Sequence, residues 1–322
     1  MKRFFTRSKL ARMLKDWFRR IFLWERWRTF VSVNDGEPRQ VVMGCHKWHT
    51  DYCADPFLFR WQNANWLFYE TLDRKGKGIL GCFKEVNGEW VQQGKILELG
   101  CHLSYPQVFE DGGRVYMIPE SFDRGNGEVA LYETDNFPFC WKKHSTLIPG
   151  GYVDSTLLRK DGHYYLACDL IYPNETAEVW HSSSLFGPWT RHPQSGNISQ
   201  SPRLRRCGGA FLEENGRLFR IAQDCNGAYG KRVYKVPITD LSENDYHEGD
   251  AELLLGRYFY GKNLARHTYN VLTDCNRKIV AFDVRDYKLQ PISHVITESV
   301  RFMFEVFAIC RRGIKRIFRR LF

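Results

Sequence analysis

The chain reads Asp55-Pro-Phe-Leu-Phe59 and, after a polar turn, Trp66-Leu-Phe-Tyr-Glu70. Two short apolar and aromatic runs separated by a polar stretch indicate a pair of adjacent β-strands. An antiparallel pair places the start of its first strand beside the end of its second strand. The two acidic residues that open and close this unit should therefore lie at the same edge of a sheet.

The same unit occurs five times along the chain. The first strands of the copies begin at five residues spaced by 50, 49, 54 and 60 positions: Asp55, Tyr105, Asp154, Gly208 and Thr268. The second strands of the copies end in an acid: Glu70, Glu120, Asp169, Asp224 and Asp283. A repeat of about 50 residues built from short strands is typical of a β-propeller. Turn sequences such as Asp161-Gly and Asn215-Gly support hairpins inside the units. We therefore predict an all-β fold, a five-bladed β-propeller.

The last copy of the unit lacks outer strands of its own. Residues 27–45 contain Thr29-Phe-Val-Ser-Val33 and Gln40-Val-Val-Met43, which have the composition of strands. If these strands joined the fifth blade, the ring would close and leave no free sheet edge between its ends. This reasoning places the propeller over residues 27–291.

Basic charge is concentrated in the two ends of the chain. Residues 1–29 contain ten Lys and Arg and two acidic residues, and residues 299–322 contain seven and one. The part between them has 30 basic and 34 acidic residues. A nucleic-acid-binding protein would carry its basic residues on the folded body, so we expect no nucleic-acid partner.

Both ends show apolar residues at helical spacing among the basic ones. The pattern predicts basic amphipathic helices over residues 1–26 and 292–322, which suit the surface of an anionic membrane. The alternative is that these helices pack on the propeller or on each other. No export signal is recognised, and this favours a cytoplasmic protein at the inner face of the membrane.

Ten cysteines are scattered singly, without a Cys-x-x-Cys pair, and no Asp-x-Asp motif occurs. A zinc site is therefore not expected, and we predict neither a metal nor another cofactor.

The candidate site lies where the inner strands begin. Asp55 and Asp154 each open an inner strand, and Glu120 ends a second strand at the same edge, so these three are the candidate catalytic residues. Several carboxylates at one mouth repel each other unless they are partnered, which favours a catalytic centre. The alternative is that the acids at the strand ends cap turns or neighbouring backbone N–H groups.

Further polar and aromatic residues precede or follow the same strands. We expect these to bind substrate: His102, Tyr105, Arg206, Gln223, Asp224, His267, Trp48 and His49. An Arg at this mouth can pair a phosphate or a carboxylate, and it can also neutralise the ring of acids.

Several motifs resemble one family. They are Ala54-Asp-Pro-Phe-Leu-Phe59, His102-Leu-Ser-Tyr-Pro106, Tyr116-Met-Ile-Pro-Glu-Ser121, Val153-Asp-Ser-Thr-Leu157, Arg206-Cys-Gly-Gly209, Arg220-Ile-Ala-Gln-Asp-Cys225 and Tyr229-Gly230. Over about residues 45–285 the chain resembles the propeller domain at the N-terminus of plant glucosamine inositolphosphorylceramide transferases and in bacterial relatives. That domain is similar in turn to glycoside hydrolase family 43.

The resemblance implies carbohydrate chemistry. Family 43 enzymes are inverting and use an Asp base, an Asp modulator and a Glu acid from blades one to three. Asp55 matches the first position, whereas Tyr105 and Asp154 replace the second and third; Glu120 is the candidate for the missing acid.

Three functions are therefore open. The first is a glycosyltransferase of surface polysaccharide or glycolipid assembly, with an activated sugar donor and a glycan or lipid-linked acceptor. The second is an inverting glycoside hydrolase, and the third is a glycan-binding propeller without catalysis. The fold alone does not decide among them.

Overall fold

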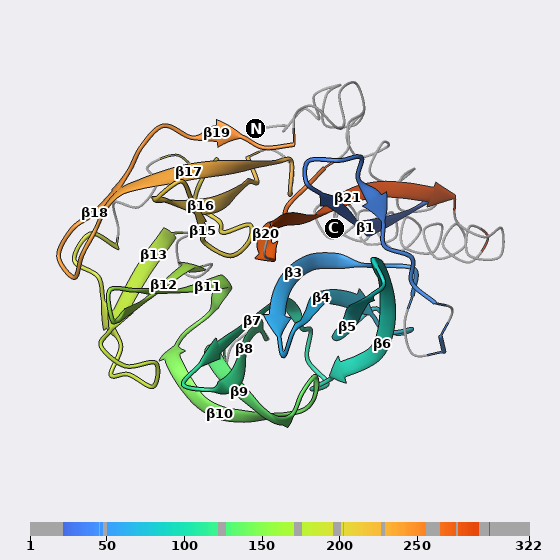
Figure 1. Ribbon diagram of the computed structural model, residues 1–322, viewed down its shortest axis with the longest axis horizontal. Helices are drawn as coiled ribbons and strands as arrows, with labels where there is room; N and C mark the ends of the chain where they lie inside the picture. The colour runs from blue at the N-terminus through green and yellow to red at the C-terminus, as the bar shows by residue number, and fades with distance from the viewer. Residues whose placement is uncertain are drawn as a thin grey trace, which may run out of the picture. The chain divides into compact units, whose positions relative to one another are not determined.

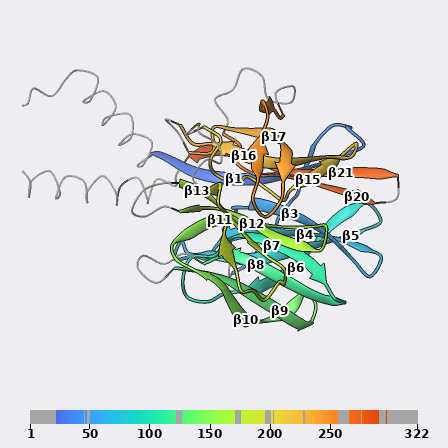
Figure 2. The same cartoon turned by 90° about the vertical axis from the view of Figure 1, so that its left-hand side faces the viewer.

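The computed structural model describes residues 22–44, 46–47, 50–121, 127–170, 176–195, 201, 203–226, 229–255, 265–274, 276–289 and 296. The strands of this described part form five sheets arranged as blades around a centre (Figure 1). The five-bladed propeller predicted from the repeat is confirmed. Seen from the side, several strands are visibly twisted, as expected for strands of L-amino acids (Figure 2).

Each of the first three blades is a meander whose four strands neighbour one another in chain order. Blade one contains β3 (Ala54–Trp61), β4 (Ala64–Leu72), β5 (Gly78–Val86) and β6 (Glu89–Leu97). Blade two contains β7 (Ser104–Asp111), β8 (Arg114–Glu120), β9 (Glu128–Asn136) and β10 (Phe139–Pro149). Blade three contains β11 (Tyr152–Lys160), β12 (His163–Leu170), β13 (Thr176–Ser182) and β14 (Thr190–Arg191).

Blade four has a short inner strand. It contains β15 (Leu212–Glu214), β16 (Arg217–Asp224), β17 (Arg232–Leu241) and β18 (Tyr246–Glu248), and β19 (Glu252–Leu253) also pairs with β17. An isolated bridge between Cys207 and Ala222 continues the inner edge beyond β15. The residues at the mouth of this blade therefore come from a loop rather than from a regular strand.

Blade five is assembled from both ends of the propeller. Its order is β2-β1-β21-β20, formed by β2 (Arg39–Gln40), β1 (Leu23–Val33), β21 (Arg277–Leu289) and β20 (Tyr269–Asp274). This confirms that N-terminal strands complete the last blade. β1 already begins at Leu23, so the last residues of the helix predicted over 1–26 are strand instead. The cause is an alternation of side chains that buries Trp27, Thr29 and Val31 on one face of β1.

The two predicted terminal helices otherwise lie outside the described residues. Within the described part, no helix is long and apolar enough to cross a membrane.

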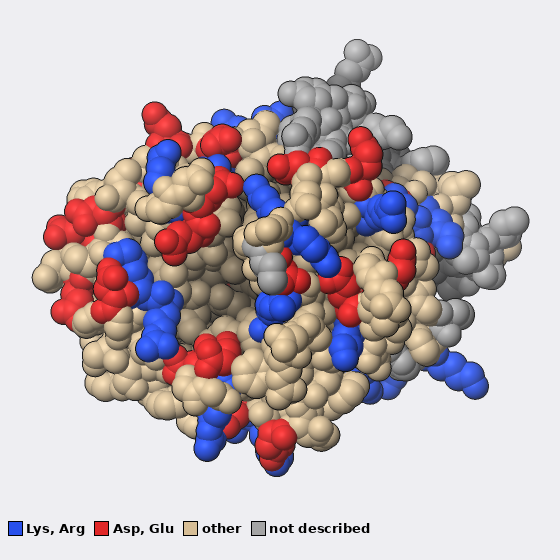
Figure 3. All heavy atoms as spheres, viewed as in Figure 1, with Lys and Arg blue, Asp and Glu red and all other residues tan. Residues whose placement is uncertain are grey.

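The core lies between neighbouring blades. In one cluster the ring of Phe137, from the turn between β9 and β10 of blade two, meets Trp66 of blade one edge-on, with ring centroids 4.9 Å apart. On the face drawn in Figure 3, a central hollow is surrounded by Lys and Arg side chains interspersed with Asp and Glu.

Candidate active site at the start of the inner strands

The inner strands of blades one to three begin with the same backbone feature. Asp55, Tyr105 and Asp154 have φ angles of 47°, 48° and 49°, and each lies in a shift of register between the first and second strands of its blade. This left-handed conformation is uncommon for residues other than glycine, especially for a bulky Tyr. Bulges of this kind redirect a side chain, and strained backbone is concentrated at functional sites.

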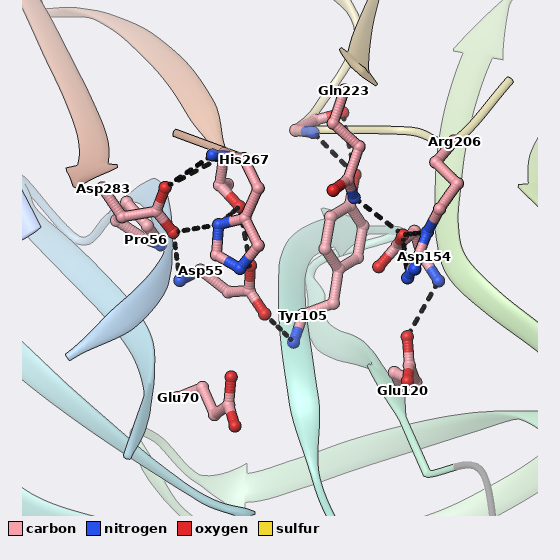
Figure 4. Close-up of polar contacts among 12 residues, drawn as sticks. Asp55, Pro56, Glu70, Tyr105, Glu120, Asp154, Arg206, Gln223, His267 and Asp283 are labelled. Carbon is pink, nitrogen blue, oxygen red and sulfur yellow. Dashed lines mark hydrogen bonds and ion pairs between the residues drawn. The ribbon is translucent and has the colours of Figure 1, made fainter. Parts of the chain in front are cut away.

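Asp55 is the centre of a buried hydrogen-bonded cluster (Figure 4). Its carboxylate accepts the N–H of Tyr105 at 3.1 Å and the hydroxyl of Thr268 at 2.6 Å. Nε2 of His267 lies 3.5 Å from the same carboxylate, and Nδ1 of His267 lies 2.5 Å from Asp283. Asp283 also accepts the backbone N–H groups of Asp55, His267 and Thr268, each at 3.0 Å. His267 is thus held between two carboxyl groups.

The burial of this cluster shifts its ionisation. Burial raises the pKa of Asp55 to about 7, although the nearby His267 acts in the opposite direction. Burial works against a charged His267, but Asp283 and Asp55 outweigh it and raise the pKa of His267 to about 9. His267 therefore holds its proton more strongly than Asp55 does, so Asp55 can lose its proton while His267 stays charged, and can then act as a base.

Asp154 lies across the mouth from Asp55 and is ion-paired. Nε and Nη2 of Arg206 are each 2.6 Å from Oδ2 of Asp154, and the side-chain amide of Gln223 donates to the same oxygen at 2.9 Å. The N–H of Asp154 in turn donates to Glu120 at 3.0 Å. These contacts bring together four residues that were predicted separately: Asp154, Arg206, Gln223 and Glu120.

Glu120 has the properties of an acid in its protonated form. Burial and the adjacent Asp154 raise its pKa to about 8, while Arg206 opposes the shift. A carboxyl group with a raised pKa can hold a proton near neutral pH, as a general acid must.

Tyr105 closes the inner end of this site. Its hydroxyl accepts the N–H of Gly209, from blade four, at 2.7 Å and lies 2.8 Å from the hydroxyl of Thr156, from blade three. Only glycine fits at position 209, because a Cβ there would lie 2.0 Å from the carbonyl oxygen of Tyr269. The phenol ring therefore spans the central axis and acts as a floor beneath the acids.

Aromatic rings form one wall of the site. The indole of Trp27 stacks on His267 with ring centroids 3.8 Å apart, and the ring of Tyr229 meets His267 edge-on at 5.3 Å. The guanidinium of Arg206 lies over the Tyr229 ring at 5.3 Å. Tyr229 is 44% exposed, so it offers a free part of its ring at the mouth. Exposed rings beside polar groups are suited to sugar binding.

Among the described residues, one group of side chains could hold a metal ion. Ligand atoms of Asp55, His267 and Asp283 lie within 4.8 Å of one another. Both ring nitrogens of His267 already face carboxylates, and Asp283 accepts three backbone N–H groups. A metal would have to displace these contacts, so the cluster fits an ion-paired histidine better than a cation site.

Comparison with known proteins identifies the family. Residues 41–276 match the model of the N-terminal region of glucosamine inositolphosphorylceramide transferase 1. The chain belongs to this family. It is 34% identical over 224 residues to glucosamine inositolphosphorylceramide transferase 1 of Arabidopsis thaliana and 33% identical over 223 residues to that of Oryza sativa subsp. japonica. These matches cover 66% of this chain but only 29% and 30% of the relatives.

Solved structures show the same fold in glycoside hydrolases. A β-xylosidase named RS223 superposes with a TM-score of 0.54 at 11% identity, covering 74% of this chain and 95% of the other. A family 43 glycoside hydrolase of Xanthomonas citri superposes with a TM-score of 0.53 at 10% identity, covering 74% and 90%. At this level of identity the likeness concerns the fold, which is that of the family 43 propellers.

The other predicted site residues of this family member differ in where they lie and in what they contact. His102 lies at the mouth, where its Nε2 is 3.2 Å from Glu70. Asp224 is fully buried and accepts the N–H of Asn226 and a hydrogen bond from Arg203, so it caps a turn. Trp48 and His49 lie outside the described residues.

Asp283, Tyr229 and Trp27 belong to the site but were not among the predicted site residues. Asp283 was recognised only as the acid of the fifth unit, and Tyr229 only as part of a motif. Trp27 gave no signal, because it reaches His267 from β1, which is remote in the sequence.

Proposed function

We propose that this chain is a carbohydrate-active enzyme that transfers a glycosyl group at the mouth of the propeller. The observation that carries the proposal is the arrangement of Asp55 and Glu120, two carboxyl groups with raised pKa values that come from different blades to one mouth. Such a pair can take a proton from one oxygen and give a proton to another as a glycosidic bond forms or breaks.

In the proposed reaction, Asp55 accepts the proton of the acceptor hydroxyl and Glu120 protonates the leaving group. Asp154 and Arg206 fix the position of Glu120 through the N–H of Asp154 and through their ion pair. Arg206 supplies positive charge toward the phosphate of an activated donor, and the exposed His102 borders the same mouth. The names of the relatives favour transfer over hydrolysis, although this chain spans less than a third of their length.

A second candidate is an inverting glycoside hydrolase. The raised pKa of Glu120 supports it, because an inverting hydrolase requires a protonated acid opposite a carboxylate that activates water. The same two residues would serve both reactions, and they differ in whether a sugar hydroxyl or water is the acceptor.

The deciding experiment offers the full-length protein nucleotide sugars and lipid-phosphate sugars, with and without glycan acceptors, and separately aryl glycosides. Asp55→Asn and Glu120→Gln are compared with Asp135→Asn, whose side chain is exposed near the end of β9, away from the mouth. Acceptor-dependent transfer that both site variants lose supports the transferase. Release of free sugar from aryl glycosides alone supports the hydrolase. Glycan binding without turnover would identify a binding module.

The terminal segments suggest where the reaction takes place. Their basic, amphipathic sequences lead us to propose that they bind an anionic membrane surface. Full-length protein should sediment with vesicles containing phosphatidylglycerol but not with phosphatidylcholine vesicles, and added salt should weaken the binding. Equal sedimentation with both vesicle types would contradict this.

A further inference from the structure

Two of the five acids at the ends of second strands, Asp283 and Glu120, have the same structural role. The carboxylate of Asp283, in blade five, accepts the N–H of Asp55, the left-handed residue of blade one. Likewise Glu120, in blade two, accepts the N–H of Asp154, the left-handed residue of blade three. In both cases an acid caps the bulge of the following blade.

Glu70 departs from this role. It pairs with Ala54 in register, as Glu120 pairs with Ser104, so it occupies the equivalent position in blade one. The N–H that it would cap is that of Tyr105, but this N–H donates to Asp55. Glu70 is therefore released from capping.

The carboxylate of Glu70 is nevertheless buried. The residue is 4% exposed, and among the described side chains only His102 pairs with it, at 3.2 Å. Figure 4 shows this carboxylate pointing toward the space between Asp55 and Glu120, with no dashed line to another residue drawn. A buried carboxylate with one partner pays a desolvation cost that further hydrogen-bond donors would offset.

His102 is fixed in one orientation. The N–H of Gly78 donates to its Nδ1 at 2.9 Å, so the ring proton lies on Nε2 and is directed at Glu70. A Cβ at position 78 would lie 2.8 Å from the imidazole and 2.3 Å from the carbonyl oxygen of Leu103, so glycine is required. The His102 side chain is 48% exposed and borders the mouth.

We propose that Glu70, held by His102, binds the substrate sugar by accepting hydrogen bonds from its hydroxyl or ammonium groups. The inference rests on the proposed function, since it requires a saccharide at this mouth. It also specifies the substrate class: a neutral or amino sugar is accepted here, and a uronic acid is repelled by Glu70 and Asp55.

The first test compares stability and needs no substrate. Glu70→Gln preserves the shape and the contact with His102, and should change the unfolding temperature by no more than about 1 °C. The matched variant Asp283→Asn affects the equivalent acid in its capping role and should lower that temperature by roughly 5 °C or more. A loss in Glu70→Gln as large as that in Asp283→Asn would show that Glu70 is structural and would overturn the proposal.

The second test measures binding of D-glucose, D-glucosamine and D-glucuronate to the full-length protein by ligand-detected NMR. Wild type should bind glucose or glucosamine at least about tenfold more tightly than Glu70→Gln does, and glucuronate most weakly. Unchanged affinity in the variant, or no binding of any of the three sugars to wild type, would overturn the inference.

Failure of the proposed function can be distinguished from failure of the inference about Glu70. If no donor is turned over but Glu70→Gln still weakens sugar binding, the inference survives and catalysis is excluded. If transfer is observed and Glu70→Gln leaves both KM and kcat unchanged, catalysis stands and the assignment of Glu70 is wrong.

Discussion

The hydroxyl oxygen of Tyr105 lies 2.7 Å from the main-chain nitrogen of Gly209, although these residues belong to blades two and four, which are not neighbours. One side chain thus crosses the axis of the propeller and joins two separate sheets. Family 43 hydrolases, by the resemblance set out above, have an Asp in this place. Here the residue at that position supports the site as a floor, through its contacts with Gly209 and Thr156.

Replacing Tyr105 with Phe should destabilise the protein without changing its fold. The variant leaves the buried N–H of Gly209 without its acceptor, which costs about 1–3 kcal/mol. Urea denaturation should show this loss. Tyr164→Phe is the control, because its hydroxyl bonds to Asp111 near the surface and should cost less than about 1 kcal/mol. Equal losses in both variants would mean that the hydrogen bond across the axis stabilises the protein no more than the bond between Tyr164 and Asp111 does.

The ion pair of Arg206 and Asp154 should show strong coupling in a double-mutant cycle. Asp154 is buried, and removing Arg206 leaves it with the amide of Gln223 as its side-chain partner among the described residues. We expect Arg206→Met to cost about 3 kcal/mol in the free energy of unfolding, and much less when Asp154→Asn is already present. Additive effects of the two changes would indicate that the pair contributes nothing.

The repeat in the sequence predicted the parts of the site that follow from strand periodicity. Asp55, Tyr105 and Asp154 occupy one position of the repeat, and the structure gives them one backbone conformation. Glu120 and Glu70 were expected at the same edge because antiparallel strands pair in that way, and the register places both there.

The sequence did not predict the roles that depend on contacts with neighbouring blades. Asp283 and Glu70 have the same place in the repeat, yet Asp283 caps the next bulge and Glu70 does not, because Asp55 takes the N–H of Tyr105. The carboxylate of Asp224 accepts the N–H of Asn226 at a turn, and its predicted contact with substrate stays a prediction. The difference between Asp283 and Glu70 arises from contacts between blades, which a single unit does not encode.

Stability should fall as the pH rises from about 5 to 9. The folded protein raises the pKa of Asp55 from 3.8 to about 7 and that of Glu120 from 4.5 to about 8. At a pH between the pKa of the unfolded state and the pKa of the folded state, the folded state binds more protons than the unfolded state. The contribution of these two groups to stability is therefore full below about pH 4 and is lost as the pH rises through 7–8. His267, with its pKa raised to about 9, acts in the same direction at higher pH. Urea midpoints at pH 5, 7 and 9 measure the effect, which Glu120→Gln should reduce; a flat profile in wild type contradicts it.

Activity should depend on pH in a bell-shaped manner with its optimum between about pH 7 and 8. Asp55 must be ionised to act as a base, so kcat/KM rises through its pKa, and Glu120 must be protonated to act as an acid, so kcat/KM falls through its own. Glu120→Gln should lose about 10²–10⁴-fold in rate together with the alkaline limb. An alkaline limb that persists in Glu120→Gln would assign the acid to another residue.

Trp27 should couple closure of the propeller to the ionisation of His267. It is buried, stacks on His267 and, through its carbonyl, accepts the N–H of Cys53, so β1 of blade five touches both the site and blade one. Trp27→Ala should lower the free energy of unfolding by about 3–5 kcal/mol, since it removes a large buried ring and leaves a cavity. Trp27→Phe keeps a stacked ring and should recover much of that loss.

The cavity left by Trp27→Ala lies against His267, so this variant should also shift the titration of His267 followed by NMR. Trp90→Ala, on the outer strand β6, should leave that titration unchanged. A loss of stability without any change in the His267 titration would show that Trp27 acts only in packing. It would also show that closure of the propeller does not affect the ionisation of the site.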